Sequence, residues 1–201
     1  MNYELLMRRC VAIGNSVLGH TYPNPNVGAL IYKDGKIISE GYTGRPGQNH
    51  AEINAIENIN DKKYLENSTM VVSLEPCSHY GKTPPCTKKI IESKIQRVII
   101  GCKDPNLLVN GSGIDQLINN NIDVKVGILE NECLELHKRF ITFQTKKRPY
   151  IVLKWAETDD GIISPKLKDN NRPYWISNDV SRQYVHKWRS QEHAISVSYT
   201  H

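Results

Sequence analysis

Hydrophobic positions at the start of the chain recur at the spacing of a helix. Four apolar side chains fall on one face of a helix predicted over residues 3–18: Leu6, Cys10, Ile13 and Val17. Two short apolar segments, ALIY and KIIS, then flank Asp34 and Gly35. An Asp-Gly pair tolerates the positive φ of a tight turn. The pattern therefore predicts an amphipathic helix followed by a β-hairpin.

Short apolar runs and helix-period segments alternate after residue 49. Strands are predicted at TMVVSLE, RVIIGC and DVKVGIL, and helices at HAEINAIENI, TKKIIESKI, GIDQLINNN and ENECLELHKRFITFQ. Strands that alternate with helices form crossover units, in which helices cover both faces of a largely parallel sheet. The prediction is an α/β fold, a three-layer α/β/α domain over residues 1–145. Its sheet is mixed, because the hairpin adds an antiparallel edge.

A short polar segment, KKRP, separates this domain from the rest of the chain. Beyond it, YIVLKWAE predicts a strand, ISNDVSRQYVHKWRSQ a capped helix and HAISVS the start of another strand. Only 52 residues, 150–201, follow this segment, whereas an ordinary domain takes about 100 or more. We therefore expect residues 146–201 to be the start of a second domain that is incomplete in this sequence.

Composition and charge narrow the class of protein. Hydrophobic residues make up 39% of the chain and charged residues 23%, which suits a globular protein with a buried core. The chain has no signal-peptide pattern and no apolar run of membrane-spanning length, which favours a cytoplasmic protein without membrane contact. The net charge of +5 suits an anionic small molecule, and no segment has the basic and aromatic pattern of a nucleic-acid surface. Whether copies associate into a homo-oligomer stays open.

Candidate chemistry gathers at two predicted helix starts. His50 and Glu52 open one helix, whereas Cys77 follows the strand VVSLE and Cys86 precedes or opens the next helix. Neighbouring crossover units bring both helix starts to the same edge of the sheet. One imidazole and two thiolates give Zn²⁺ three protein ligands, and an open fourth position is typical of catalytic zinc. Glu52 is placed beside such a metal to move protons in hydrolytic deamination.

Two other interpretations stay open at this point. In a non-catalytic zinc-binding module, Glu52 would be an ordinary first-turn acid that the helix dipole favours. A deaminase of a nucleobase, a nucleotide or tRNA would use the same four side chains. The remaining cysteines are interpreted as buried core residues rather than as a disulfide framework: Cys10, Cys102 and Cys133.

The segment HAE…LEPCSHYGKTPPC is more specific than the general deaminase pattern. That pattern usually has two residues between the cysteines, whereas eight stand between Cys77 and Cys86. With PNPNVGALIY before it and DPNLLVNGSGI after it, the chain resembles the bifunctional deaminase–reductases of riboflavin biosynthesis over essentially its whole length. RPYIVLKWAETDDGII and WISNDVSRQYVHKWRSQEHAI resemble the opening of the family's reductase domain, which has a dihydrofolate-reductase-like fold.

The resemblance implies a reaction and a set of residues. Zn²⁺ would be held by His50, Cys77 and Cys86, with Glu52 as the proton donor. Asn24 would hold the pyrimidine of the phosphorylated substrate, and three residues would contact its ribosyl phosphate side: His79, Lys82 and Asn106. The reaction would be hydrolytic loss of the 2-amino group from 2,5-diamino-6-(5-phosphoribosylamino)pyrimidin-4-one. The products would be ammonia and 5-amino-6-(5-phosphoribosylamino)uracil.

For the second segment, the resemblance implies NADPH as a cofactor. Ala156 and Trp175 match cofactor-side positions, and Arg189 matches a substrate-phosphate position. Two residues depart from the family pattern: Thr43 stands where many relatives have His, and Pro173 stands where a Ser is common. Because the family's reductase continues well past these segments, we expect deamination without a working reductase. We also expect the unfinished strand to leave an open edge that is prone to association.

Overall fold

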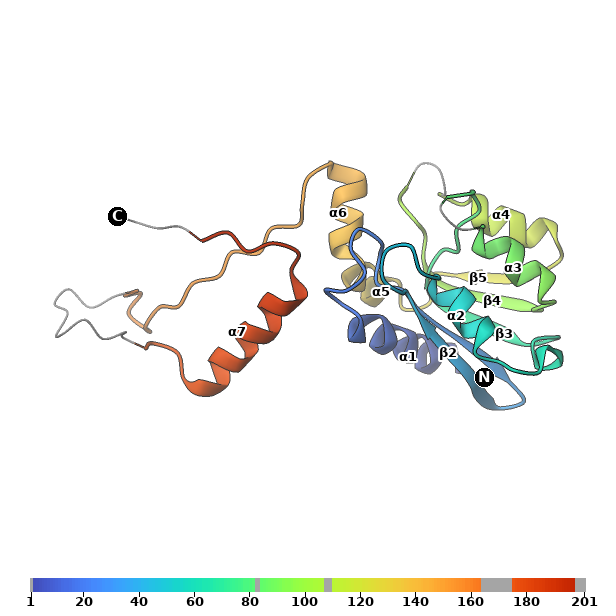
Figure 1. Cartoon of the computed structure of the whole chain (residues 1–201), viewed down its shortest axis with the longest axis horizontal. Helices are drawn as coiled ribbons and strands as arrows, with labels where there is room; N and C mark the ends of the chain where they lie inside the picture. The colour runs from blue at the N-terminus through green and yellow to red at the C-terminus, as the bar shows by residue number, and fades with distance from the viewer. Residues whose placement is uncertain (1, 82–83, 107–109, 164–174, 198–201) are drawn as a thin grey trace. The chain divides into compact units, whose positions relative to one another are not determined.

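The computed structural model describes residues 2–81, 84–106, 110–163 and 175–197 (Figure 1). The chain divides into two compact units, Met1–Tyr150 and Ile151–His201. None of the described helices is both long enough and apolar enough to cross a membrane.

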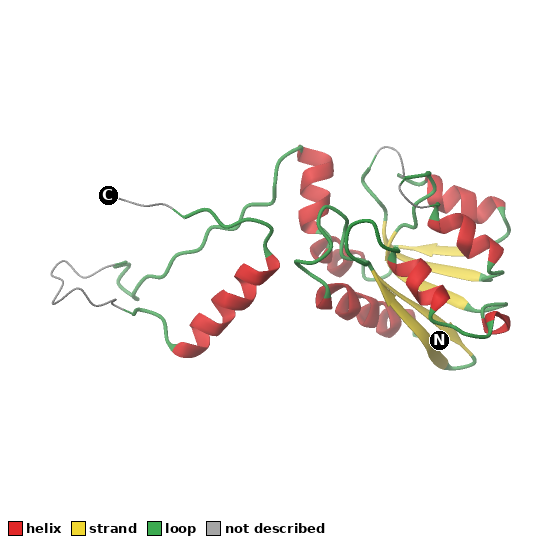
Figure 2. Ribbon diagram, viewed as in Figure 1, coloured by secondary structure: helices red, strands yellow, loops and turns green. Residues whose placement is uncertain are grey.

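A five-stranded mixed sheet organises the first unit (Figure 2). Its strands, in chain order, are β1 (Gly28–Lys33), β2 (Lys36–Tyr42), β3 (Thr69–Leu74), β4 (Arg97–Cys102) and β5 (Asp123–Val126). In space their order is β2-β1-β3-β4-β5; β1 pairs antiparallel with both β2 and β3, and β3, β4 and β5 run parallel. The predicted α/β fold with a mixed sheet is confirmed.

The hairpin forms where the sequence predicted it. Lys33 pairs with Lys36 across the turn, and both turn residues have positive φ, 49° at Asp34 and 81° at Gly35. Glycine adopts such angles without steric cost, and aspartate tolerates them better than most residues. The Asp-Gly pair therefore closes the turn in the geometry that joins two antiparallel strands.

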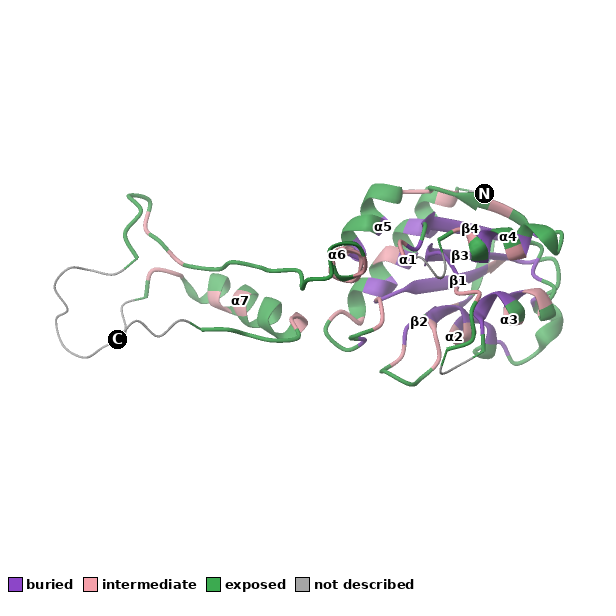
Figure 3. Cartoon of the chain, turned by 90° about the horizontal axis from the view of Figure 1, so that it is seen from above, coloured by how far each residue is buried: buried purple, intermediate pink, exposed green. Residues whose placement is uncertain are grey.

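Helices cover both faces of the sheet. The helices of the first unit are α1 (Tyr3–Ser16), α2 (Ala51–Glu57), α3 (Cys86–Glu92), α4 (Ser112–Asn119), α5 (Glu130–Leu136) and α6 (Lys138–Lys146), with a short 3₁₀ turn, η1, at Lys62–Tyr64. Helices α1 and α5 pack together on one face, and α2, α3 and α4 follow one another along the other (Figure 1). Strand β3 lies between these layers with all of its residues buried (Figure 3), as expected for a strand covered on both faces.

One predicted helix is two helices in the structure. The segment ENECLELHKRFITFQ leaves helical geometry at His137, where φ is −96° and ψ is 8°, and α6 then starts at Lys138. Helix α5 buries Cys133 and Leu136 against the sheet, and after the break α6 runs in a different direction (Figure 1). The single-helix prediction was wrong because periodicity alone does not show a change of direction between two helices that are both amphipathic.

In the second unit the described residues form one helix, α7 (Asp179–Gln191). The Asn178 side chain caps it by accepting a hydrogen bond from the backbone N–H of Ser181 at 2.8 Å. The strands predicted at YIVLKWAE and HAISVS are absent from the described residues 151–163 and 175–197. An extended segment becomes a strand only when a neighbour completes its hydrogen bonds, and no described segment of this unit does so. A dihydrofolate-reductase-like fold here stays a prediction.

His137, at the break between α5 and α6, is fully buried. Its Nε2 lies 3.1 Å from the Ser73 hydroxyl oxygen, and its Nδ1 has no hydrogen-bond partner among the described residues. Burial lowers the pKa of His137 from 6.5 to about 4, because a charged ring would lose its hydration. The folded protein therefore keeps this ring neutral at pH values where the unfolded chain would protonate it.

We expect this histidine to make the fold sensitive to acid. Since the pKa is lower in the folded state, the contribution is fully present above pH 6.5 and is lost as the pH falls towards 4. The difference between the two pKa values corresponds to about 3 kcal/mol of unfolding free energy. Urea unfolding of the wild type and of His137→Gln, carried out between pH 6.5 and pH 4, measures how the free energy of unfolding changes with pH. The variant should lose about 3 kcal/mol less on acidification; equal losses in both proteins would contradict the assignment.

Candidate active site

The start of α2 carries the first two functional side chains. His50 is the residue that precedes the helix, and Glu52 lies in its first turn with only 4% of its surface exposed. Helix α2 packs directly against β2. The two backbones are so close at Gly41 that a Cβ added there would lie 2.2 Å from the carbonyl oxygen of Ala51. A glycine in β2 is therefore what allows the close approach that places His50 and Glu52 at the edge of the sheet.

Two cysteines come from the neighbouring crossover unit. Cys77 follows the end of β3, and Cys86 is the first residue of α3. The backbone N–H of Cys86 donates to the sulfur of Cys77 at 3.4 Å, and the backbone N–H of Thr87 donates to the Cys77 carbonyl at 3.2 Å. These two bonds hold the loop after β3 against the first turn of α3, so that both sulfurs face the same point.

The structure brings three of the predicted site residues together. His50 Nδ1 lies 3.6 Å from the sulfur of Cys77 and 3.3 Å from the sulfur of Cys86, and all three ligand atoms lie within 4.8 Å of one another. Tetrahedral zinc with ordinary Zn–S and Zn–N bonds keeps its ligand atoms about 3.5–3.8 Å apart. The His50, Cys77 and Cys86 cluster therefore fits Zn²⁺ in both chemistry and spacing.

The ionisation of two side chains at this cluster suits its chemistry. The contact with the Cys86 side chain lowers the pKa of Cys77 to about 4, which favours the thiolate, the form that ligates metals. Burial raises the pKa of Glu52 to about 7, which is the range in which a carboxyl group both accepts and releases protons at neutral pH.

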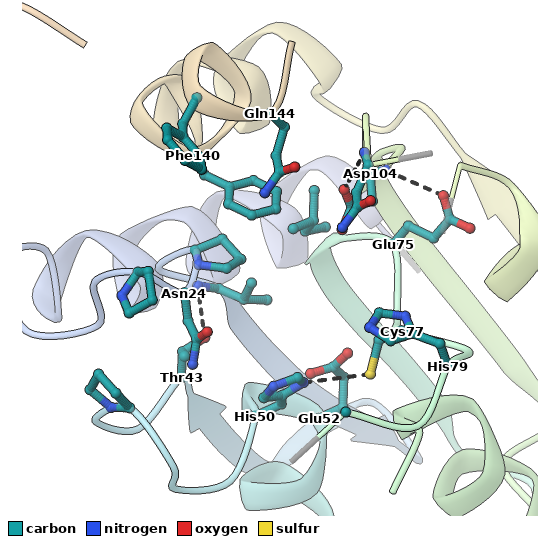
Figure 4. Close-up of a pocket in the computed structure, with 18 of the residues that line it drawn as sticks. Asn24, Thr43, His50, Glu52, Glu75, Cys77, His79, Asp104, Phe140 and Gln144 are labelled. Carbon is teal, nitrogen blue, oxygen red and sulfur yellow. Dashed lines mark hydrogen bonds between the residues drawn. The ribbon is translucent and has the colours of Figure 1, made fainter. Parts of the chain in front are cut away.

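A cavity of about 430 Å³ opens beside the cluster (Figure 4). Of the predicted substrate residues, Asn24, His79 and Asn106 line this cavity, whereas Lys82 lies outside the described residues. Thr43, the first departure from the family pattern, also lines it. Its hydroxyl oxygen accepts a hydrogen bond from the backbone N–H of Val27 at 3.0 Å, so this side chain ties β2 to the loop before β1.

The residues predicted for NADPH and the second phosphate lie in the second unit. Ala156 is half-buried, Trp175 and Arg189 are exposed, and the guanidinium of Arg182 stacks over the Trp175 ring at 4.5 Å. Pro173, the second departure from the family pattern, lies outside the described residues. The roles of Ala156, Trp175 and Arg189 stay predictions.

The sequence interpretation missed the wall of the cavity that faces the cluster. Figure 4 shows Phe140 and Gln144 of α6 across the cavity from His50 and Glu52. Phe140 and Gln144 are four residues apart and share one helix face with Phe143, which also lines the cavity. The signal was present as amphipathic spacing, but such spacing normally indicates a face packed on the core rather than a cavity wall.

Comparisons with known proteins agree with this geometry. The zinc-binding region of cytidine and deoxycytidylate deaminases matches residues 1–102. Riboflavin biosynthesis protein RibD of Aquifex aeolicus is 41% identical over 95% of this chain and 52% of its own length. RibD of Escherichia coli is 37% identical over 98% of this chain and 53% of its own length. The chain thus spans about half the length of the curated relatives it matches, and the resemblance drawn from its motifs is confirmed.

A solved structure leads to the same group of proteins. The crystal structure of a diaminohydroxyphosphoribosylaminopyrimidine deaminase/5-amino-6-(5-phosphoribosylamino)uracil reductase from Thermotoga maritima superposes with a TM-score of 0.85 and 45% sequence identity. The superposition covers 93% of this chain and 52% of that one. Both the fold and the sequence of this chain are therefore similar to about half of that protein.

Loss of one ligand should remove the metal. We expect about one zinc per chain in the wild type and little or none in Cys86→Ser, because two remaining ligands hold Zn²⁺ far less tightly than three. Cys102→Ser is the matched control: Cys102 is also buried, but its sulfur donates to the Ser73 carbonyl instead of facing the cluster. Elemental analysis after dialysis measures the content. Full zinc occupancy in Cys86→Ser would refute the ligand assignment.

Proposed function

Because this chain belongs to the family of deaminases that share the cytidine and deoxycytidylate deaminase zinc-binding region, we propose that it is a zinc-dependent pyrimidine deaminase of riboflavin biosynthesis. Its substrate would be 2,5-diamino-6-(5-phosphoribosylamino)pyrimidin-4-one, and its products ammonia and 5-amino-6-(5-phosphoribosylamino)uracil. The observation that carries the proposal is that His50 and Cys77 of the metal-ligand cluster and the buried Glu52 line one cavity. The similarity to RibD proteins supports the choice of substrate.

Two roles are assigned to the side chains at the site: three of them would bind Zn²⁺, and one would transfer protons. His50, Cys77 and Cys86 would hold Zn²⁺, which when bound supplies Lewis-acid activation of water near neutral pH. Glu52 is buried beside these ligands and would take a proton from the attacking water. The same carboxyl group would deliver protons to the ring nitrogen and then to the departing amine. A C–O bond forms, the C–N bond breaks and ammonia leaves, so the atoms of one water molecule account for the products.

The volume and the lining residues of the cavity suit a phosphorylated pyrimidine. The cavity volume of about 430 Å³ lies in the range of pockets that enclose small molecules. In the proposed arrangement, Asn24 binds polar atoms of the ring, and Phe140 supplies an apolar face opposite the cluster. His79 and Asn106 would lie towards the ribosyl phosphate, together with Lys82. This assignment gives the positive net charge of +5 a role in attracting an anionic substrate.

Two variants of one helix test the chemistry. The zinc-loaded chain should release ammonia from the phosphoribosyl pyrimidine, and Glu52→Gln should keep its zinc while kcat falls about a hundred- to ten-thousand-fold, as for other lost proton-transfer groups. Glu57→Gln, also on α2 but with an exposed side chain, should stay near wild-type activity. Near-normal turnover by Glu52→Gln would assign proton transfer to another group.

A substrate panel tests the substrate itself. The zinc-loaded chain is offered the phosphoribosyl pyrimidine, its dephosphorylated analogue, cytidine, dCMP and tRNA under the same conditions. We expect the phosphorylated pyrimidine to have the highest kcat/KM. Preferential deamination of any other member of the panel would overturn the substrate assignment. The metal and Glu52 assignments would not be affected, because the zinc content and the Glu52→Gln variant test them separately.

A further inference from the structure

Glu75 places a buried carboxylate next to the candidate active site. Only 3% of its surface is exposed, and it stands two residues before Cys77. Its two oxygens accept hydrogen bonds from four backbone N–H groups: Asp104 at 3.2 Å, Gly111 at 3.0 and 3.1 Å, Gly113 at 3.0 Å and Ile114 at 3.3 Å. Figure 4 shows the bond between Glu75 and Asp104. Among the ion pairs of the described residues, none involves this carboxylate.

Backbone donors take the place of a cation around this charge. Gly113 and Ile114 lie in the first turn of α4, where backbone N–H groups have no partner within the helix. Glu75 satisfies them from another segment of the chain, and the positive end of the helix dipole stabilises its negative charge. A carboxylate has about four acceptor positions, and the backbone donors occupy them. Glu75 is therefore used for holding the chain and has little capacity left for a ligand.

The same carboxylate holds both described ends of the connection between β4 and α4. Asp104 follows β4 at one end, and Gly111 precedes α4 at the other. Within the connection, a side-chain oxygen of Asp104 accepts from the backbone N–H of Asn106 at 2.8 Å, and the Asn106 carbonyl accepts from the backbone N–H of Asn110 at 2.9 Å. Asp104 and Asn106 both line the cavity. The position of this part of the cavity wall thus depends on Glu75.

Two further contacts fix α4 to the segment that carries Cys77. A Cβ at Gly113 would lie 2.2 Å from the carbonyl oxygen of Pro76. Only glycine therefore allows the start of α4 to come this close to the backbone of Pro76. The hydroxyl oxygens of Ser78 and Ser112 are 2.6 Å apart. The segment that carries Cys77 and the start of α4 are therefore packed against each other, and the Glu75 carboxylate lies between them.

We propose that Glu75 is a positioning residue for substrate binding. It holds Asp104 and Asn106 at a set distance from the His50, Cys77 and Cys86 cluster, so that the ring lies at the cluster while the ribosyl phosphate side of the substrate meets Asn106. This inference rests on the proposed function, because it assigns Asn106 to the phosphoribosyl side of the same substrate. Glu75 acts on binding through the backbone and takes no part in proton transfer. Its loss should raise KM far more than it lowers kcat.

Glu75→Gln is the direct test. Glutamine has the same shape, but it removes the charge and points an N–H₂ donor at backbone donors. We expect unchanged zinc content, kcat within about threefold of the wild type, and a KM for the phosphoribosyl pyrimidine about tenfold or more higher, the usual scale for losing hydrogen bonds to a charged group. A KM equal to that of the wild type, or a kcat that falls as much as KM rises, would overturn the proposal.

Leu117→Ala is the matched control. Leu117 is fully buried on the same helix and is not among the hydrogen-bond partners of Glu75. Its truncation destabilises α4 by leaving a cavity, but KM should stay near the wild-type value. A KM increase in Leu117→Ala as large as that in Glu75→Gln would mean that general weakening of α4, rather than the carboxylate, sets substrate affinity, and it would overturn the proposal.

Hydrogen exchange separates failure of this inference from failure of the proposed function. The backbone N–H of Asp104 lies outside α4 and bonds to Glu75. Relative to the N–H groups of β3, its exchange should become about tenfold faster or more in Glu75→Gln and stay unchanged in Leu117→Ala. This readout needs no substrate. Unchanged exchange of Asp104 in Glu75→Gln would overturn the structural link even if the enzyme assay supports the proposed function.

If Glu75→Gln does not fold, Glu75→Asp takes its place under the same criteria. Aspartate keeps the negative charge, but it is one methylene shorter and cannot reach both ends of the connection. The same rise in KM and the same faster exchange at Asp104 are expected, and wild-type values for both would overturn the proposal.

Discussion

The distances between His50 Nδ1 and two cysteine sulfurs, 3.6 Å to Cys77 and 3.3 Å to Cys86, are the constraint on which the candidate active site depends. Such contacts require two helix starts, α2 and α3, to reach the same edge of the sheet. The close approach of α2 to Gly41 and the backbone bonds from α3 to Cys77 achieve this. Zinc binding would therefore be coupled to correct packing of both helices, because no single element contains all three ligands.

The cavity has two sides with different origins in the chain. Residues of the matched zinc-binding region, 1–102, supply the metal cluster and Glu52. Asp104, Asn106 and the α6 residues Phe140 and Gln144 lie beyond that region and form other parts of the wall. Under the proposed function, the shared region would perform deamination and bind part of the substrate through Asn24 and His79, and the later segments would complete the binding site. Glu75 would connect the two, since it lies in the shared region and holds the β4–α4 connection.

Much of the candidate site could be predicted from local sequence. His50, Glu52, Cys77 and Cys86 stand at element boundaries, and the chemistry of their side chains restricts what they do when they meet. The role of Glu75 could not be predicted in this way. Its partners are backbone N–H groups 29 to 39 positions away, and a backbone N–H has no sequence signature. The α6 wall was hidden for a related reason, because core packing and a cavity wall require the same amphipathic spacing.

The sequence by itself determined most elements of the first unit, the order in which they alternate and the type of the candidate metal ligands, because hydrophobic period, turn residues and ligand type are local properties. It did not determine where the helix divides at His137, nor which face of α6 meets the cavity. It predicted a strand at YIVLKWAE that the described residues do not form, since a strand exists only when a neighbour pairs with it. Tertiary structure decided these points because each depends on contacts between segments far apart in the chain, and periodicity carries no information about such contacts.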